Sequence, residues 1–361
     1  MKYIHKLQNI IKNNILTIAF TLFLIFLIIF SQTNLFAAQQ GLKLWAKNVV
    51  PSLFPFFIAT ELLNYTNIPY YLGRLTNKFM RPLFNVPGEA SYAFIMGIIS
   101  GYPVGAKIVN KFLEDGTCTK SEAERMLAFT NNSGPLFIIG TVGISLFGDS
   151  TIGIILFITH ILSCLTVGLL FGFISKHILI KKQRLYRNAS HTASYGISDL
   201  GTLLSSSITN SISTILLIGG FIVLFSIIIS ILNNLNIIDY ISNFLSIIHI
   251  PNEYGKSIFT GLLELTNGIN AITSINVKHM SSQIIISAFL LGFAGISIFL
   301  QIFSIASKNN LSMKPYFIGK LLQGFIAGFY TFLILNCFDF FFFICHTRNF
   351  YFHLYIYWMF F

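Results

Sequence analysis

Charged residues are scarce in this chain of 361 residues, where Asp, Glu, Lys and Arg together make up 10% and hydrophobic residues 54%. Soluble domains are about one quarter charged, so the chain lacks the polar surface that a water-soluble protein of this size needs. The mean hydropathy is correspondingly high, at +0.74. This composition excludes an ordinary soluble protein and predicts a chain that lies mostly in lipid.

Cysteine and histidine are few and poorly placed for a disulfide framework or a metal site. The four cysteines show neither disulfide nor zinc spacing, and the eight histidines are scattered without a His-x-x-x-His pair. A metal site would have to be assembled from residues distant in the sequence. We therefore expect no metal site.

Motifs of enzymes and of ATP-driven pumps are missing as well. The sequence has no P-loop, no Gly-x-Ser-x-Gly elbow and no carboxylate pair at a spacing suited to acid–base catalysis. We expect neither enzymatic activity nor transport powered by ATP on this chain. The net charge of +11 does not indicate nucleic-acid binding, because the basic residues fall between apolar blocks.

What the chain does contain is long apolar runs, and runs of 18 or more residues predict membrane-spanning helices. Five runs approach or meet that length: Phe20–Phe30, Ile152–Ile174, Ile212–Leu232, Gln283–Phe303 and Tyr316–Leu335. In hydrocarbon only helices or closed barrels pair all their backbone groups. Barrel strands are short and alternating, whereas these runs are continuous. We predict an all-α polytopic membrane protein.

The N-terminus has the outline of a signal peptide, because three lysines precede the first apolar region and small residues follow Phe36. However, the region Ile15–Phe30 is long for a signal-peptide core, and Ala-x-Ala is absent. We predict an uncleaved first helix with a cytoplasmic N-terminus.

The distribution of basic residues constrains which segments cross the membrane. Lys and Arg form five groups, at residues 2–12, 74–81, 107–125, 176–187 and 308–320, which the positive-inside rule places in the cytoplasm. All five lie on one side only if Ala90–Phe112 and Ser257–Val277 turn back instead of crossing. Both segments are interrupted, the first by Ser100–Gly105 with its glycines and proline, the second by Glu264–Gly268. We predict two re-entrant hairpins that enter from opposite faces.

An internal repeat has the same organisation. Gly97–Ala106 parallels Gly261–Asn270, and Ala128–Gly134 parallels Ala288–Gly295. Interrupted segments in matching halves indicate a transporter binding site near the bilayer midplane. We predict a helical bundle of two inverted repeats, each with a re-entrant hairpin and a broken transmembrane helix.

This topology divides the chain into five parts. They are an N-terminal transmembrane helix over residues 1–44, a first repeat over 45–175, a basic cytoplasmic linker over 176–208, a second repeat over 209–336 and an aromatic tail over 337–361. The tail is compatible with an interfacial segment, with part of an extra helix and with an altered reading frame.

Polar residues at the interruptions are the candidate binding residues, since a charge in mid-helix costs about 2.5–3.5 kcal/mol on insertion scales. The first hairpin supplies Ser100, Gly101, Tyr102, Pro103, Gly105 and Lys107. The following helix supplies Asn131, Asn132, Ser133, Gly134 and Pro135. The second hairpin supplies Glu264, Thr266, Asn267 and Gly268.

These residue types favour an anionic ligand. Pro135 breaks its helix, and a broken helix offers unpaired N–H groups and a positive dipole end. Lys107 would add a full charge, and Glu264 is suited to accept a proton, coordinate a cation or pair with Lys107. The structural alternatives are that the glycines and proline serve packing, that Lys107 extends to the cytoplasmic surface, and that Glu264 pairs only structurally. His160 is expected in helix packing.

Three of these stretches resemble the YlbJ (SpoVV) family of sporulation integral membrane proteins, which belongs to the nucleoside-recognition or Gate domain group. They are Gly97–Lys107, Thr130–Gly143 and Gly261–Gly268, and the resemblance covers roughly Asn48–Leu335. It implies a multi-pass protein of the outer forespore membrane, or of the cell membrane, of an endospore-forming bacterium. It also implies a fold like the core of concentrative nucleoside transporters and a role in passing dipicolinic acid towards the forespore.

Three interpretations of function remain. The first is transport of a small organic anion, foremost dipicolinic acid, whose carboxylates would meet helix-end N–H groups, Lys107 and the amides of Asn131 and Asn132, with Tyr102 or Phe137 on its ring. The second is a carrier of nucleosides or another solute, and the third is a non-transporting scaffold in spore assembly. The expected partners are the substrate, the lipid bilayer, and further copies or other spore membrane proteins, without nucleic acid. No cofactor is expected beyond a coupling cation or proton.

Overall fold

The computed structural model describes residues 2–178, 199–247, 249–276 and 280–359, and it describes side chains for residues 14–175, 199–247, 249–276 and 280–337. The described part is helical and contains no strand. The predicted all-α class is therefore confirmed. Most of the predicted basic linker lies outside the described residues, and so do the side chains of the aromatic tail.

The first half of the chain combines two long helices with shorter helical segments. In order they are α1 (Lys2–Ile29), α2 (Ser31–Leu44), a π-helix η1 (Trp45–Val49), α3 (Val50–Leu63), α4 (Ile68–Phe79), a π-helix η2 (Met80–Phe84), α5 (Ala90–Ser100), α6 (Val104–Glu114), α7 (Lys120–Thr130), a π-helix η3 (Leu136–Phe147) and α8 (Ser150–Ile178).

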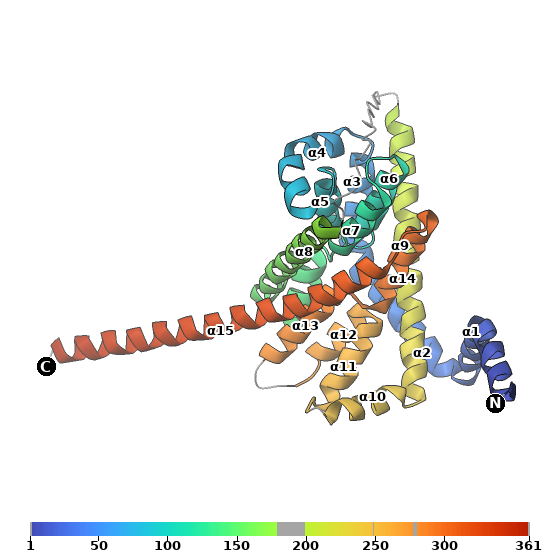
Figure 1. The fold of residues 1–361 in the computed structure, drawn as a ribbon. Coiled ribbons are helices and arrows are strands. Elements are labelled where there is room, and N and C mark those ends of the chain that lie inside the picture. Colours follow the sequence, from blue (N-terminus) through green and yellow to red (C-terminus); the bar gives the residue numbers. More distant parts are fainter. Residues whose placement is uncertain (1, 179–198, 248, 277–279, 360–361) are drawn as a thin grey trace.

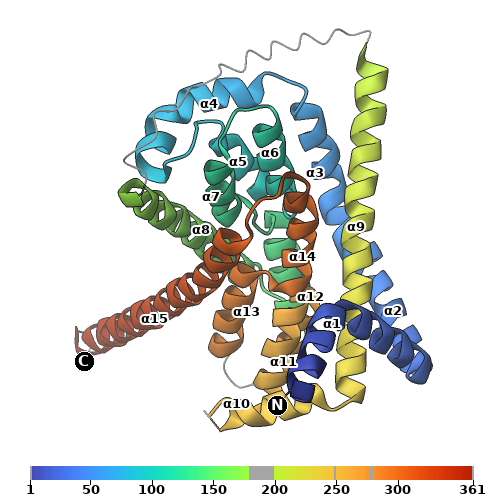
Figure 2. The ribbon, with the colours of Figure 1, turned by 45° about the vertical axis from the view of Figure 1, so that its right-hand side comes forward.

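The second half repeats the alternation of long and broken helices. It consists of α9 (Leu200–Asn234), α10 (Ile237–Ser246), α11 (Asn252–Leu263), α12 (Leu265–Thr273), α13 (Ser281–Phe293), α14 (Gly295–Ala306), a 3-10 turn η5 (Ser307–Asn309) and α15 (Lys314–Met359). In Figures 1 and 2, α9 runs the length of the molecule along one side.

Several helices are long and apolar enough to cross a membrane. Within the described residues they are Ser150–Ser175, Leu200–Asn234, Ser281–Asn309 and Lys314–Cys337. A fifth span is obtained if Asn14–Ile29 and Ser31–Leu63, which meet at an angle of 99°, are counted together. The chain is thus an integral membrane protein.

Two helix pairs fold back on themselves at the predicted interruptions. Between α5 and α6 the chain turns at Gly101, whose φ of +80° favours glycine. A Cβ atom on Gly97 would lie 3.5 Å from the Cα of Gly105, so glycines bring the two arms together. Between α11 and α12 the turn is at Glu264, and a Cβ on Gly268 would lie 2.0 Å from the Cα of Gly261. Figures 1 and 2 place these hairpins in opposite halves of the molecule.

Two further helices are broken in mid-course. After α7 the chain is extended from Asn131 and resumes a helical path after Pro135 as η3. Between α13 and α14 the break falls at Ala294 and Gly295, both with positive φ. The sequence comparison of the halves matched Ser133 and Gly134 to these same two residues.

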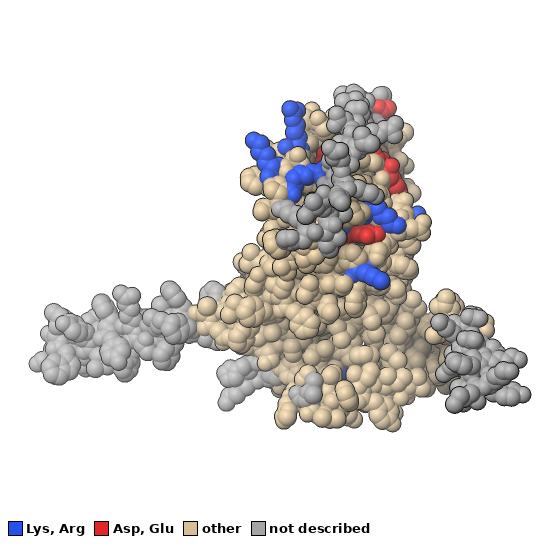
Figure 3. Space-filling model, viewed as in Figure 1, with Lys and Arg blue, Asp and Glu red and all other residues tan. Residues whose placement is uncertain are grey.

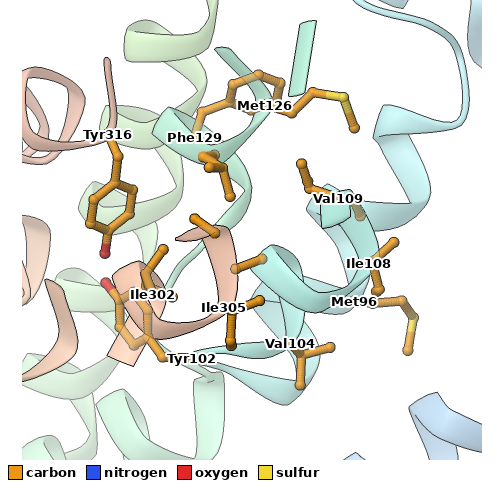
Figure 4. Close-up of a cluster of buried hydrophobic side chains, with 14 of the residues drawn as sticks. Met96, Tyr102, Val104, Ile108, Val109, Met126, Phe129, Ile302, Ile305 and Tyr316 are labelled. Atoms are coloured by element: carbon orange, nitrogen blue, oxygen red, sulfur yellow. The ribbon is translucent and has the colours of Figure 1, made fainter. Parts of the chain in front are cut away.

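A buried apolar cluster fastens the first hairpin to both halves of the chain. Figure 4 shows Met96, Val104, Ile108 and Val109 from the hairpin, Met126 and Phe129 from α7, and Ile302, Ile305 and Tyr316 from the second half. Tyr102 lies at the tip of the hairpin, and its hydroxyl points towards that of Tyr316 (Figure 4). The cluster fixes where the hairpin tip lies.

Charged side chains gather at one end of the molecule. In Figure 3 the lysine, arginine, aspartate and glutamate atoms lie mainly over the end that carries α4 and α6, and the rest of that face is largely uncharged. At this end Arg81 forms an ion pair with Glu122 at 3.0 Å, and Thr119 and Glu122 form a capping box that starts α7. A charged end next to an apolar body is typical of a protein whose body lies in lipid.

The glycine contact of the second hairpin can be tested by adding one methyl group. We expect Gly268→Ala to reduce the free energy of unfolding by about 1–3 kcal/mol, because the added Cβ would meet the backbone of Gly261. The measurement is the thermal unfolding midpoint of the purified protein in detergent. Gly220→Ala on α9 is the control, because its Cβ would meet no atom within 4 Å. Equal midpoints for the two variants would contradict this packing.

Candidate functional site

A small cavity lies where the two hairpin tips and the broken helix α7–η3 meet. Its volume is about 60 Å³. Its polar or turn-forming lining residues are Gly101, Tyr102, Ser133, Gly134, Glu264, Thr266 and Gln301, and its apolar lining residues are Val49, Leu53, Phe137, Ile218, Ile222, Leu265 and Ile298. Segments far apart in the sequence therefore form one cavity, which we call the central pocket.

Four helical segments begin next to this pocket. They are α6 after Pro103, η3 after Pro135, α12 after Glu264 and α14 after Ala294. Only α12 has a side-chain cap, in which Glu264 accepts a hydrogen bond from the backbone N–H of Asn267 at 2.7 Å. The other three have no side-chain cap. Uncapped helix N-termini carry partial positive charge, so this surrounding favours a negatively charged group.

The two asparagines of the break complete the end of α7. The side-chain amide of Asn131 donates to the Leu127 carbonyl at 3.1 Å, and that of Asn132 donates to the Phe129 carbonyl at 2.8 Å. Both side chains are fully buried. Their N–H donors are thus engaged with backbone carbonyls rather than directed at the pocket, which differs from the ligand role expected of these amides.

A buried lysine from the second half binds the same break. The ammonium of Lys320, on α15, donates to the Asn131 carbonyl and lies 2.8 Å from Gln323 Oε1, 3.4 Å from Asn132 Oδ1 and 3.4 Å from Tyr102 Oη. It also lies 5.2 Å from the centre of the Tyr102 ring, within range of a cation–π interaction. Lys320 is 1% exposed. The sequence grouped Lys320 with the basic residues 308–320, whereas the structure buries its side chain against the broken helix.

Further contacts hold α8 and α15 against the break. The backbone N–H of Ser133 donates to Nε2 of His160 on α8 at 3.2 Å. Gln323 Nε2 donates to Asn132 Oδ1 at 3.1 Å. Three oxygens of this stretch remain without a hydrogen-bond partner, namely Thr130 Oγ1, Asn131 Oδ1 and Ser133 Oγ. The site thus retains acceptor capacity that neighbouring side chains do not use.

Lys107 is not part of the pocket. Its ammonium donates to the Thr214 hydroxyl and lies 3.4 Å from Glu61 Oε1. It therefore joins α6 to α3 and α9. The pairing of Lys107 with Glu264 that the sequence suggested does not form in this structure, because each side chain has other partners.

Glu264 contributes a buried carboxyl group to the pocket, and only 2% of the residue is exposed. Its Oε2 accepts the Asn267 N–H described above, an arrangement that the positive end of α12 stabilises. No lysine or arginine forms an ion pair with it among the described residues. The carboxyl group is therefore available to a proton or a cation.

The remaining candidates from the sequence fall into two groups. Gly101, Tyr102, Ser133, Gly134 and Thr266 line the pocket, and Pro103 and Pro135 lie at the helix starts beside it. Ser100, Gly105 and Gly268 serve packing, where Ser100 bonds Thr60 Oγ1 at 2.6 Å and the two glycines allow backbone contacts. Asn267 faces away from the pocket and donates to Ser226 Oγ on α9 at 3.1 Å.

Reasoning from the sequence missed Lys320, Gln323 and Gln301. Lys320 and Gln323 are three residues apart and so share one face of a helix, inside the apolar run Tyr316–Leu335. A lone ionisable residue in such a run indicates a functional site by default, and this signal was available. Gln301 sits inside an apolar run in the same way.

The arrangement is that of a binding site, and its chemistry is the recognition of charge and shape. The described residues hold no group of three or more histidine, cysteine, aspartate or glutamate side chains placed to bind a metal ion. A cavity of about 60 Å³ has room for a few water molecules, whereas ligand pockets usually measure 300–1,000 Å³. A larger ligand therefore requires the pocket to widen.

Comparison with known proteins identifies relatives of this chain. Residues 46–164 match the Gate family, described as "Nucleoside recognition". The chain is 36% identical to the sporulation integral membrane protein YlbJ of Bacillus subtilis over 344 residues, which are 91% of this chain and 84% of the relative. It is also 30% identical over 135 residues to an uncharacterized protein of Alkalihalophilus pseudofirmus, covering 36% of this chain and 28% of that protein. No solved structure matches.

The lysine contact can be tested by removing its charge. We expect Lys320→Met to reduce the free energy of unfolding by about 1–3 kcal/mol, because the Asn131 carbonyl would lose its partner in a buried site. The measurement is the thermal unfolding midpoint in detergent. Lys314→Met is the matched control, since Lys314 is exposed at the start of the same helix. If Lys320→Met unfolded at the same temperature as the control, the contact would not stabilise the fold.

Proposed function

We propose that this chain, which belongs to the family of the sporulation integral membrane protein YlbJ, is a membrane transporter of a small organic anion during endospore formation. One observation carries the proposal. Three helix N-termini without side-chain caps converge on a pocket that also contacts both hairpin tips. Such half-helix ends at the centre of a membrane protein are the usual means of holding an anionic solute.

In this proposal the positive charge near the pocket is that of Lys320, and not that of Lys107 as the sequence suggested. Its ammonium lies behind Tyr102, which lines the pocket. A charge in a medium of low dielectric constant acts over longer distances than in water, so it favours an anion in the pocket even without direct contact. Lys320 thus makes the pocket favour a solute of negative charge.

Dipicolinic acid is the substrate that we favour. Its carboxylates would face the uncapped starts of α6 and η3, and its ring would lie against the apolar side chains of the lining, among them Phe137 and Leu265. The resemblance to the family points to this compound and to the outer forespore membrane. Because the pocket is smaller than such a solute, the structure corresponds in this proposal to a closed state.

The proposed mechanism uses the hairpins as two gates. In this proposal α5–α6 and α11–α12 are re-entrant hairpins of two inverted repeats, and they enter from opposite faces as in the core of concentrative nucleoside transporters. Separation of one tip from the broken helix would open the pocket to one side. The glycine contacts within each hairpin let it move as a rigid unit.

Glu264 is the candidate group for coupling to a proton or a cation. It lines the pocket together with Tyr102, and an ionised carboxylate there would repel an anionic solute. Uptake of a proton or a cation by Glu264 would remove that repulsion. Solute and cation would then bind together, which couples their movement.

A nucleoside carrier is the second candidate, because the Gate family is described by nucleoside recognition. Buried Gln301 and Thr266 also line the pocket and can exchange hydrogen bonds with hydroxyl groups. The two candidates differ in the solute that vesicles containing the purified protein accumulate. Uptake of uridine without uptake of dipicolinate would favour the nucleoside carrier.

The proposal predicts a defect in spores rather than in growth. Deletion of the gene in its own host should lower spore dipicolinate and leave the compound in the mother cell, and the unaltered gene should restore it. Glu264→Ala should fail to restore it, whereas the exposed Glu253→Ala should succeed. The measurements are dipicolinate in mother cell and spore fractions and the amount of each variant in the membrane. Normal spore dipicolinate with Glu264→Ala at full membrane level would refute the assigned role.

A further inference from the structure

A second hollow, larger than the central pocket, lies between α2 and α9. Its volume is about 810 Å³. It is lined by Gln32, Thr33, Phe36, Ala37 and Gln40 of α2, by Ser226, Ile229, Ser230, Asn233 and Asn234 of α9, and by Asn267 of α12. It belongs to the half of α9 next to α10, away from the end where charged side chains gather (Figures 1 and 3). We call this hollow the α2–α9 crevice.

The crevice is lined by uncharged residues. Most of its lining side chains carry amide or hydroxyl groups, and none of the described ones carries a charge. Their mutual hydrogen bonds are few, and one joins the Asn234 amide to Thr33 Oγ1 at 2.7 Å. Amide and hydroxyl groups placed between membrane helices are costly unless they face water or a solute. The composition therefore fits a water-filled space that a polar solute can enter.

The crevice and the central pocket are lined by neighbouring positions of α9. Ile218 and Ile222 line the pocket, and Ser226 and Ser230, at the same four-residue spacing, line the crevice. On α12, Thr266 lines the pocket and the next residue, Asn267, lines the crevice. Successive positions on this face of α9 are about one helical turn apart, roughly 5–6 Å. The two spaces are thus separated by a thin barrier.

A side-chain hydrogen bond between α12 and α9 lies between the two spaces. Asn267 Nδ2 donates to Ser226 Oγ at 3.1 Å, and the backbone N–H of the same asparagine donates to Glu264 at 2.7 Å. Asn267 therefore contacts both a lining residue of the crevice and the carboxyl group of the pocket. Movement of α12 away from α9 would break the first bond.

Because the two spaces are neighbours, we propose that the α2–α9 crevice is the vestibule through which a small carboxylate reaches the central pocket from the end opposite the basic residues. The proposal rests on the proposed function and adds its entry path. Amide N–H groups are uncharged donors that bind a carboxylate weakly, so the solute can leave them and pass to the pocket. A lipid phosphate would lack a basic partner in this crevice, which favours the soluble carboxylate.

The test uses a cysteine at the crevice and a matched cysteine outside it. The full chain with Cys337 and Cys345 replaced by serine, the parent, is expressed in a bacterial host, and uptake of radiolabelled dipicolinate by intact cells is measured. Asn233→Cys places a thiol at the crevice, and Asn243→Cys places one on α10, where the side chain is equally exposed but lines no part of the crevice. Both variants are treated from outside with a negatively charged, membrane-impermeant methanethiosulfonate.

We expect both variants to react with the reagent, and only the Asn233→Cys variant to lose uptake, by at least fivefold. Excess unlabelled dipicolinate should slow the reaction of Asn233→Cys and leave that of Asn243→Cys unchanged. Complete modification of Asn233→Cys with unchanged uptake would overturn the vestibule, and so would its failure to react from outside. Protection by anionic lipid vesicles but not by dipicolinate would also overturn it, in favour of a lipid site. Absence of dipicolinate uptake by the parent would instead count against the proposed function itself.

Discussion

The interaction on which the site depends is the one between the ammonium of Lys320 and the broken end of α7. A helix that ends within a bilayer leaves backbone carbonyls without partners, and water is not there to replace them. In this protein two asparagine amides close the last turn, and the lysine takes the carbonyl of Asn131. Hydrogen bonds to a charged group contribute about 1.5–3 kcal/mol each. Several of them offset the cost of about 2.5–3.5 kcal/mol for a lysine in mid-membrane.

The same contact determines where the pocket can be. Because Lys320 also touches Tyr102, the hairpin tip, the broken helix and α15 are held at one point, and the apolar cluster around Met126 and Ile302 fixes their spacing. Glu264, at the start of α12, also lines the pocket. The second half of the chain therefore supplies both the buried ammonium of Lys320 and the carboxyl group of Glu264, and the first half supplies the hairpin tip and the broken helix that they contact.

Much of this architecture could be predicted from the sequence, because its signals are local. The apolar runs, the glycine and proline interruptions and Glu264 each mark their own segment, and charge distribution indicated which segments turn back. The partners of the polar groups could not be predicted in the same way. The position of Lys320 inside the apolar run Tyr316–Leu335 marked it as unusual, but the tertiary packing of α15 on α7 decides that it, and not Lys107, contacts the site. Likewise, the sequence marked Asn131 and Asn132 as unusual. It could not show that their side-chain amides donate to backbone carbonyls of α7, because this depends on the backbone path after the helix ends.

The burial of Lys320 has a consequence for how the protein is made. During synthesis α7 enters the membrane well before α15, and until α15 arrives the Asn131 carbonyl at the end of α7 lacks the ammonium that it finally accepts. Conversely, α15 carries a lysine that lipid alone does not accommodate well. Each of these two elements therefore supplies a hydrogen-bonding partner that the other needs. In a truncated first half the Asn131 carbonyl would therefore lack the lysine that donates to it, so the correct insertion of each half depends on the other.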